Sequence, residues 1–505
     1  MFKFFLVSSL AIIMASGCEG SSTTTQPPTE TVGASDTASN SNTDSNNDSA
    51  SNESFTETNS DTTPTPTPSD TSTETPEAPT SVGISFSPND VTILFPAPTS
   101  QSDMSKMIRL TDFDSDRVMP QSVFDRTIQI STGPTGAVRG SRHRIGFRSA
   151  PQRQDWIISG IRIDPGAPGL SKGIFDVFGK SPQIRLVVQP VRDTEFGLDI
   201  DDISLHLVYA FHGPDQGNAC SLHNTPDMAR FSQVVNDLKV IKDRFAADHG
   251  VDSSGPLNVH PAFDVAGVEY RNALRDYLNT HLTQDTLFAV SIAGIPQRFE
   301  PWIFLAMNNT PAGLQPIPSP ATVQASQDPS QANFSQMLNF RGDTPPVMPM
   351  PATRNMAPID CNMNFPNAVS AQVAGAGMST SMAFGGGGDI ETVSAVIADA
   401  RASHFFNTDC VSCHTETRKQ IDDVQPRSAR GARLNQIASE AGIHPAVMPH
   451  GNWNVRVMGW APIDELNNTP GAHATLSRRA ATETAEVVEC FHTEKWNSVN
   501  ESCLP

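Results

Sequence analysis

Basic side chains are scarce in this sequence. Its 505 residues include 34 Lys and Arg against 54 Asp and Glu, which gives a formal net charge of -20. Nucleic acids and anionic lipid headgroups are bound by clustered Lys and Arg, so the composition argues against both as partners. Eleven of the acidic residues and no Lys or Arg lie between residues 19 and 82. The acidity therefore belongs largely to that segment and says little about a docking surface.

Several enzyme signatures are also missing. The sequence contains no G-x-S-x-G, no H-E-x-x-H and no phosphate-binding loop, so hydrolase, metalloprotease and nucleotide-binding functions have no support. Near the N-terminus, Lys3 is followed by apolar residues at 4–7 and 10–14, a run too brief to span a bilayer as a mature helix. A charged start followed by a short apolar run is typical of an export signal.

The export signal ends at Ala15-Ser16-Gly17-Cys18. This segment resembles the lipobox of bacterial lipoproteins, although Ala15 stands where that family prefers Leu. The resemblance implies that residues 1–18 are a lipoprotein signal peptide and lipobox, and that Cys18 is lipidated. We therefore expect a protein anchored by lipid to the periplasmic side of a membrane or to the cell surface, with ordinary signal-peptide cleavage as the alternative.

Residues 19–81 are rich in Ser, Thr, Asn, Asp and Pro, with Phe55 as the one large apolar side chain. Such a segment cannot bury enough apolar surface to offset the entropy lost on ordering. We predict a disordered tether. The Thr-Pro repeat at 63–68 favours extended polyproline geometry, which gives the tether reach.

Residues 82–388 show three patterns. Alternating apolar residues bounded by Gly, Pro and Asp predict a β-sandwich over 82–215, with strands at 91–95, 123–130, 156–163, 184–188 and 203–211. An α+β region is predicted over 216–307, with helices at 225–245 and 268–282 and strands at 287–295 and 302–307. The Pro- and Gly-rich stretch 308–388 is predicted to be an irregular linker.

Polar residues in the predicted sandwich give little evidence of chemistry. Asp199, Asp201 and Asp202 could line a calcium loop, but acidic turns of this kind favour a solvated loop. His206 and His212 are interpreted as ordinary strand and loop residues rather than as metal ligands.

The strongest chemical signal is Cys410-Val411-Ser412-Cys413-His414, which has the C-x-x-C-H form of a covalent heme attachment site. Cysteines three residues apart share a face of a helix, so both thiols can reach one porphyrin edge, and the adjacent imidazole can ligate iron. A zinc site with His444 and His450, a thioredoxin-like motif and a simple disulfide are the alternatives. Export favours heme, because thioether attachment takes place outside the cytoplasm.

Residues 389–505 resemble the class I cytochromes c in the order of their elements: a helix, C-x-x-C-H, a Met-containing loop and a C-terminal helix. The resemblance covers about 115 residues, and its specific part is the attachment motif. It implies an all-α domain holding one heme c, with Cys410 and Cys413 as thioether donors and His414 as the proximal ligand. The distal ligand is predicted to be Met448, with Met458 as the alternative and bis-histidine ligation by His444 or His450 as a further one.

The remaining cysteines form an even set, which suits an oxidising compartment. We favour disulfides between Cys490 and Cys503 and between Cys220 and Cys361.

The leading functional hypothesis is electron transfer to a redox protein partner outside the cytoplasm by a membrane-anchored monoheme cytochrome. One alternative is a heme-dependent oxidoreductase or a gas or redox sensor whose N-terminal domains bind a ligand. A surface binding lipoprotein is the other. The di-heme peroxidases, which the chain also resembles in part, need two attachment motifs, and this chain has one.

Overall fold

The structure is a computed structural model, and it describes residues 83–114, 116–132, 147, 151–195, 197–212, 225–294, 303–310, 312–317, 390–403, 410–422, 427–449, 457–464 and 469–505. The chain divides into two units, Met1–Pro76 and Glu77–Pro505. All described residues belong to the second unit. The lipidation site predicted at Cys18 and the tether predicted at 19–81 lie outside them.

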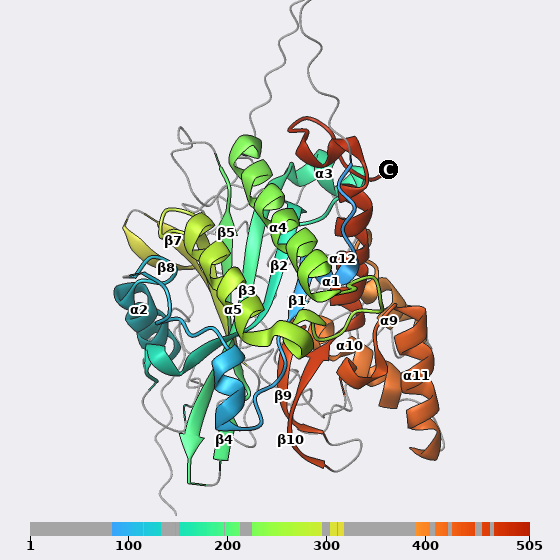
Figure 1. The fold of residues 1–505 in the computed structure, drawn as a ribbon. Helices are drawn as coiled ribbons and strands as arrows, with labels where there is room; N and C mark the ends of the chain where they lie inside the picture. Colours follow the sequence, from blue (N-terminus) through green and yellow to red (C-terminus); the bar gives the residue numbers. More distant parts are fainter. Residues whose placement is uncertain are drawn as a thin grey trace, which may run out of the picture. The chain divides into compact units, whose positions relative to one another are not determined.

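The described strands of this unit form one large sheet and one hairpin (Figure 1). The eight strands of the large antiparallel sheet are β1 (Thr92–Leu94), β2 (Trp156–Ala167), β3 (Ser181–Thr194), β4 (Gly197–Ile200), β5 (Ile203–Ala210), β6 (Leu287–Gly294), β7 (Ile303–Thr310) and β8 (Gly313–Ile317). Their spatial order is β1-β2-β3-β5-β6-β7-β8, with β4 paired to β3. The hairpin consists of β9 (Met458–Asp464) and β10 (Thr469–Leu476).

The helices come from all parts of the unit. They are α1 (Pro88–Val91), α2 (Gln121–Thr132), α3 (Lys172–Phe178), α4 (Met228–His249), α5 (Ala262–His281), α9 (Ile390–Ala398), α10 (Cys410–Asp422), α11 (Arg430–Glu440) and α12 (Arg478–Phe491). Among these helices, none combines the length and the apolarity that crossing a bilayer requires.

One face of the large sheet, which we call the apolar face, is built from aliphatic side chains. Paired residues on neighbouring strands point to the same face, and one such row runs across five strands through Ile161, Leu186, Leu207, Val290 and Met307. Each member of this row is fully buried or nearly so.

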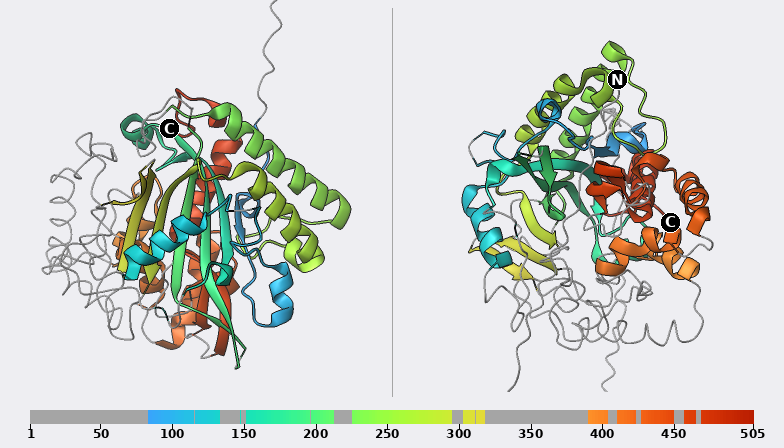
Figure 2. Two further views of the ribbon diagram at one scale, coloured as in Figure 1. Left: turned by 90° about the vertical axis from the view of Figure 1, so that its left-hand side faces the viewer. Right: turned by 90° about the horizontal axis from the view of Figure 1, so that it is seen from below.

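Helices α4 and α5 belong to this side of the molecule and lie next to each other (Figure 2). Phe211, which follows β5, contacts Phe231 of α4 with 5.7 Å between ring centroids. Helix α4 begins at an Asp227 cap, whose carboxylate accepts from the Arg230 amide, and ends at Gly250 in the left-handed conformation. Its buried side chains then recur at helical spacing along one face: Met228, Phe231, Val234, Val235, Leu238 and Phe245.

The opposite face, which we call the histidine face, has polar and small residues. Its corresponding row is Gly160, Val187, His206 and Ser291. Hairpin β9–β10 and helix α12 pack against the β2–β3 part of this face. Gln189 of β3 accepts a hydrogen bond from the Trp460 amide at 2.7 Å and donates one to the Trp460 carbonyl at 3.0 Å, which fixes β9 on the sheet.

A buried ion-pair network joins α12 to the same face. Glu483 lies 2.7 Å from Arg162 of β2, 2.9 Å from Arg479 and 3.4 Å from Arg185 of β3. Burial acts to raise the pKa of Glu483, but the guanidinium groups of Arg479, Arg162 and Arg185 outweigh it and hold the pKa at about 2. Glu483 is therefore ionised at neutral pH. Its charge compensates Arg479 of α12 and Arg162 of β2, while Arg185 also pairs with Asp164 at 2.7 Å.

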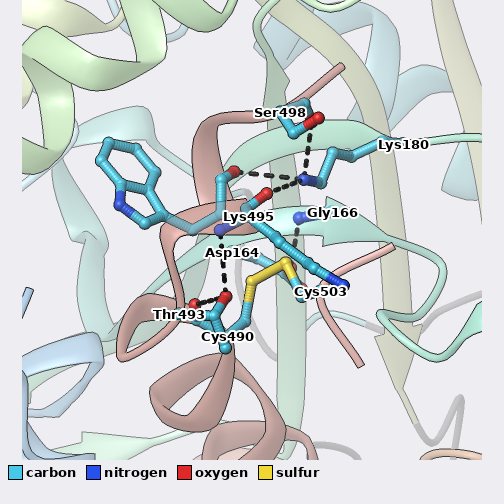
Figure 3. Close-up of a disulfide and its surroundings, with 9 residues drawn as sticks. Asp164, Gly166, Lys180, Cys490, Thr493, Lys495, Ser498 and Cys503 are labelled. Carbon is cyan, nitrogen blue, oxygen red and sulfur yellow. Dashed lines mark hydrogen bonds between the residues drawn. A yellow bond between two sulfur atoms is a disulfide. The ribbon is translucent and has the colours of Figure 1, made fainter. Parts of the chain in front are cut away.

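The C-terminal tail is tied down by a disulfide and by a buried lysine (Figure 3). Cys490, at the end of α12, is bonded to Cys503, which confirms that predicted pairing. The Lys180 ammonium donates to the carbonyls of Lys495, Trp496 and Ser498 at 2.9–3.2 Å. Burial lowers the pKa of Lys180 to about 8. The tail is thus held against the start of β3 by contacts that only the folded chain can make.

The predicted fold class is wrong in two respects. The strands of 156–210 do not form a sandwich of their own, because they pair with strands 287–317 in a single sheet whose apolar face is packed with helices. No all-α cytochrome c-like domain is evident among the described C-terminal residues, because β9 and β10 lie between α11 and α12 and pack on the large sheet. Alternation of apolar residues identifies a strand, but it does not identify the strand's partners.

One predicted strand is also wrong. Residues 123–130 belong to helix α2, not to a strand. Their β-branched residues favour a strand by propensity, but the buried side chains recur as they do on one face of a helix: Val123, Phe124, Thr127, Ile130 and Ser131. The predicted helices at 225–245 and 268–282 are confirmed by α4 and α5.

Candidate functional site

Helix α10 carries the attachment motif in its first turn. Cys410 is its first residue, and Cys413 and His414 follow one turn later, both half-buried. The rest of the helix is anchored by buried polar contacts: the Thr417 hydroxyl accepts from the Arg478 amide at 2.9 Å, and Gln420 accepts from the Arg478 guanidinium. The start of α12 therefore fixes the position of the helix that carries the motif.

His414 faces a second histidine from the large sheet. The imidazole rings of His414 and His206 lie 6.5 Å apart between centroids, with 51° between their planes. His206 is in β5, on the histidine face, paired with Val187 of β3 and Ser291 of β6. The fold thus brings together His206 and His414, which are 208 positions apart in the sequence.

The surroundings of His206 on the β6 side consist of small side chains. On the histidine face, Ser204 pairs with Ala293, His206 with Ser291 and Val208 with Ala289. His206, Val208, Ala289 and Ser291 are half-buried, whereas their neighbours on the apolar face are buried, for example Leu207 and Val290. This part of the histidine face is therefore less covered than the apolar face, and no side chain larger than Val flanks His206 along β5 or at its paired positions in β6.

The two predicted distal methionines take different places. Met458 begins β9 and packs its Sδ and Cε against Gly160 of β2. Gly160 is two strands from His206 in the same row, a separation of about 10 Å at the usual spacing between strands. Met448 is fully buried after the short 3-10 helix at Pro445–Val447. The role of either Met as a ligand stays a prediction.

The histidines of the alternative ligand sets are less informative. His444 is exposed, and its Nδ1 accepts from the Ala446 amide at 3.2 Å as a cap of the 3-10 helix. His450 lies outside the described residues. Within the part of the chain that the structure describes, no group of three or more His, Cys, Asp and Glu side chains is arranged to hold a metal ion.

A buried carboxylic acid follows the motif. Glu416 is fully buried, its nearest cation is Arg478 at 3.8 Å, and the Thr417 hydroxyl donates to it. Burial raises the pKa of Glu416 to about 7 despite the opposing effect of Arg478. Helix α10 is therefore held against α12 by a polar but largely dehydrated contact.

A separate cavity of about 270 Å³ lies among α1, α4 and α5. Four of the polar residues that line it are Asp90, Lys242, His260 and Tyr270. The His260 ring stacks on Tyr270 with 4.4 Å between centroids, and burial lowers the pKa of His260 to about 3. Burial raises the pKa of Asp90. The cavity could bind a small polar molecule.

Other predicted residues can now be placed. The calcium loop gains no support, because Asp201 and Asp199 pair with Arg192 at 2.7 and 3.3 Å. Cys220 and Cys361 lie outside the described residues, so their pairing stays a prediction. The residue that sequence reasoning set aside is His206. Its strand pattern carries no local signal of ligation, and only the register of β5 and the packing of α10 bring it to His414.

Comparisons with protein-family models, with curated proteins and with solved structures find no match to this chain. Function is therefore inferred from the residues and from their geometry.

Proposed function

We propose that this chain is a lipid-anchored monoheme c-type cytochrome that transfers electrons outside the cytoplasm. The observation that carries the proposal is the C-x-x-C-H motif at the start of α10, with its histidine ring 6.5 Å from the ring of His206 in the large sheet. Helical spacing of the cysteines suits attachment to one porphyrin edge. His414 is half-buried. Partial exposure suits a heme ligand, because the porphyrin ring must be able to reach the imidazole.

Each residue of the motif would have a distinct role in binding heme. Cys410 and Cys413 would hold heme through thioether bonds, and His414 would ligate its iron. Bound heme supplies a one-electron redox couple. The buried contacts of α10 with α12 would hold the motif in position against the sheet. A redox protein would be the partner, and Cys18 would supply the membrane anchor.

Covalent heme is the direct test. The full chain is expressed in a host that attaches heme to exported proteins, and heme is stained on a denaturing gel. We expect a stained band that disappears in the double variant Cys410→Ser, Cys413→Ser and remains in the matched control Cys490→Ser, Cys503→Ser, which removes two other cysteines. An unstained wild-type band would overturn the proposal.

The anchor is tested separately. Cys18→Ser should move the protein from the membrane fraction to the soluble fraction without removing the heme stain. Membrane retention unaffected by this substitution would contradict lipidation at Cys18 and leave the heme proposal standing.

A second candidate function is a heme-dependent oxidoreductase or sensor, which the cavity lined by Asp90, Lys242, His260 and Tyr270 favours. Such a protein needs an open or displaceable iron ligand. Carbon monoxide binding by the reduced wild-type protein would favour this candidate. Absence of carbon monoxide binding would favour the electron carrier.

A further inference from the structure

We infer that His206 is the second axial ligand of the heme iron, so that the sheet and helix α10 each supply one imidazole. The inference rests on the proposed function and adds the ligand that completes the site. It also replaces the predicted methionine by a residue more than two hundred positions earlier in the chain.

The separation of the two rings supports this assignment. A metal–nitrogen bond to histidine is about 2 Å long, and each ring centre lies roughly 1 Å beyond its nitrogen, so two imidazoles on opposite sides of one metal have centres about 6 Å apart. The observed separation is 6.5 Å. Tetrahedral zinc would bring the two centres to about 5 Å. The spacing of His206 and His414 therefore suits opposite ligands better than adjacent ones.

The setting of His206 supports it independently. Its neighbours toward β6 on the histidine face are small, and the side chains of His206, Val208, Ala289 and Ser291 are only half-buried although they lie on inner strands of the sheet. Inner strands covered on both faces have buried side chains on both, as β2 has. The positions that flank His206 on β5 and β6 thus carry small, half-buried side chains, so a flat macrocycle beside this residue would displace no large side chain of these two strands.

The methionines do not share these features. Met458 uses its sulfur end to fill the place left by Gly160 in β2. His206 also sits on a strand held by two neighbours, and a ligand on a regular element is positioned more precisely than one on a loop. Ligation by two histidines lowers the reduction potential relative to His/Met ligation and leaves no open position for a gas.

The test uses the full heme-loaded protein and the variants His206→Ala and His206→Met. The wild type should show a low-spin ferric spectrum without the weak band near roughly 695 nm that methionine ligation gives, and it should not bind carbon monoxide. His206→Ala should convert the iron to high spin and allow carbon monoxide to bind, and added imidazole should restore the low-spin spectrum. His206→Met should raise the reduction potential.

The controls separate ligation from folding. His212→Ala removes another histidine, two residues beyond the end of β5, and should leave the spectrum unchanged, as should Met448→Ala and Met458→Ala. Rescue by imidazole shows that the His206→Ala protein is folded around its heme, which a structural role of His206 would not produce.

Each contrary outcome has a distinct meaning. Stained covalent heme with a spectrum unchanged by His206→Ala overturns the second ligand and leaves the cytochrome intact. Loss of the low-spin spectrum in Met448→Ala or Met458→Ala also overturns it, in favour of methionine. A wild-type protein without covalent heme overturns both this inference and the proposed function. Zinc found in place of iron by metal analysis would show that the same side chains form a zinc site.

Discussion

The two faces of the large sheet are built on different principles. The apolar face presents Leu207 and its row of aliphatic neighbours, closed by the helices of residues 228–281. The histidine face is formed by the neighbouring residues of the same strands. Its row is Gly160, Val187, His206 and Ser291. Side chains alternate between faces along a strand, so a single set of strands carries both patterns.

The difference separates stability from chemistry. Burial of apolar side chains is the main favourable contribution to folding, and the apolar face supplies it mostly with aliphatic side chains. The histidine face instead carries the ion pairs of Glu483, the contacts of Trp460 and the imidazole of His206. These polar groups fix the position of the C-terminal elements rather than maximise the buried apolar area.

The largest effect should come from removing the charge that organises the histidine face. Glu483→Gln leaves Arg162 and Arg479 without the carboxylate that pairs with them, while Arg185 keeps its contact with Asp164 at 2.7 Å. Removing one partner of a buried charge network costs about 3–5 kcal/mol, because the remaining charges are uncompensated. We expect the free energy of unfolding, measured by urea denaturation, to fall by that amount.

The control for this prediction is on the same helix. Glu489→Gln removes an exposed carboxylate that pairs with Arg401 at 3.2 Å, and it should change the free energy of unfolding by less than about 0.5 kcal/mol. Equal effects of the two substitutions would show that the network under α12 contributes no more than a surface ion pair.

A pair of matched valines compares the two faces directly. Val188 is fully buried on the apolar face, whereas Val208 is half-buried on the histidine face. Val188→Ala should lower the free energy of unfolding by about 2 kcal/mol, through lost burial and a residual cavity, and Val208→Ala by less than about 1 kcal/mol. Denaturation curves of the two variants check this, and a larger loss at Val208 would contradict the assignment of the faces.

Buried ionisable groups should also make the stability depend on pH. Burial lowers the pKa of His260, just before α5, to about 3. The histidine is therefore protonated near pH 6.5 in the unfolded chain but stays neutral at that pH in the folded chain. The stability contributed by this group is complete above pH 6.5 and is lost as the pH falls. Between pH 7 and 5 the loss should reach up to about 2 kcal/mol. His260→Phe should remove this part of the slope.

A group near α12 should act in the opposite sense. Burial raises the pKa of Glu486 to about 7, so its contribution to stability is complete below pH 4.5 and is lost as the pH rises through 7. Glu486→Gln should therefore steepen the loss of stability on acidification, while His260→Phe should flatten it. Denaturation at several pH values distinguishes the two signs.

Local patterns in the sequence predicted the elements better than their assembly. Helices α4 and α5 could be predicted, because their apolar residues recur every three or four positions and each has a clear end. Hairpin β9–β10 could not, because the attachment motif and the flanking helices suggested an all-α order. The pairing of β5 with β6 crosses two helices, and no local rule specifies such a partner.

The candidate site shows the same division. Cys410, Cys413 and His414 form a compact motif, so the prediction of a heme attachment site could be made from spacing alone, and it stays a prediction. The disulfide between Cys490 and Cys503 was also within reach, because the two residues are 13 positions apart. His206 could not be found in this way, since its proximity to His414 depends on the register of a central strand and on the packing of a distant helix.

The two ends of the described unit are interleaved, and this has a kinetic consequence. The Ile84 amide donates to the Phe491 carbonyl at 2.7 Å, and the Thr92 and Thr484 hydroxyls are hydrogen-bonded at 2.7 Å. Contacts between residues so far apart in sequence make folding slow. Helix α12 lies near the end of the chain and packs on the histidine face, so that part of the face stays exposed until the last helix has been synthesised. Under the proposed function, heme would be attached to the motif on α10 during that delay, and the packing of α12 on the sheet would end it.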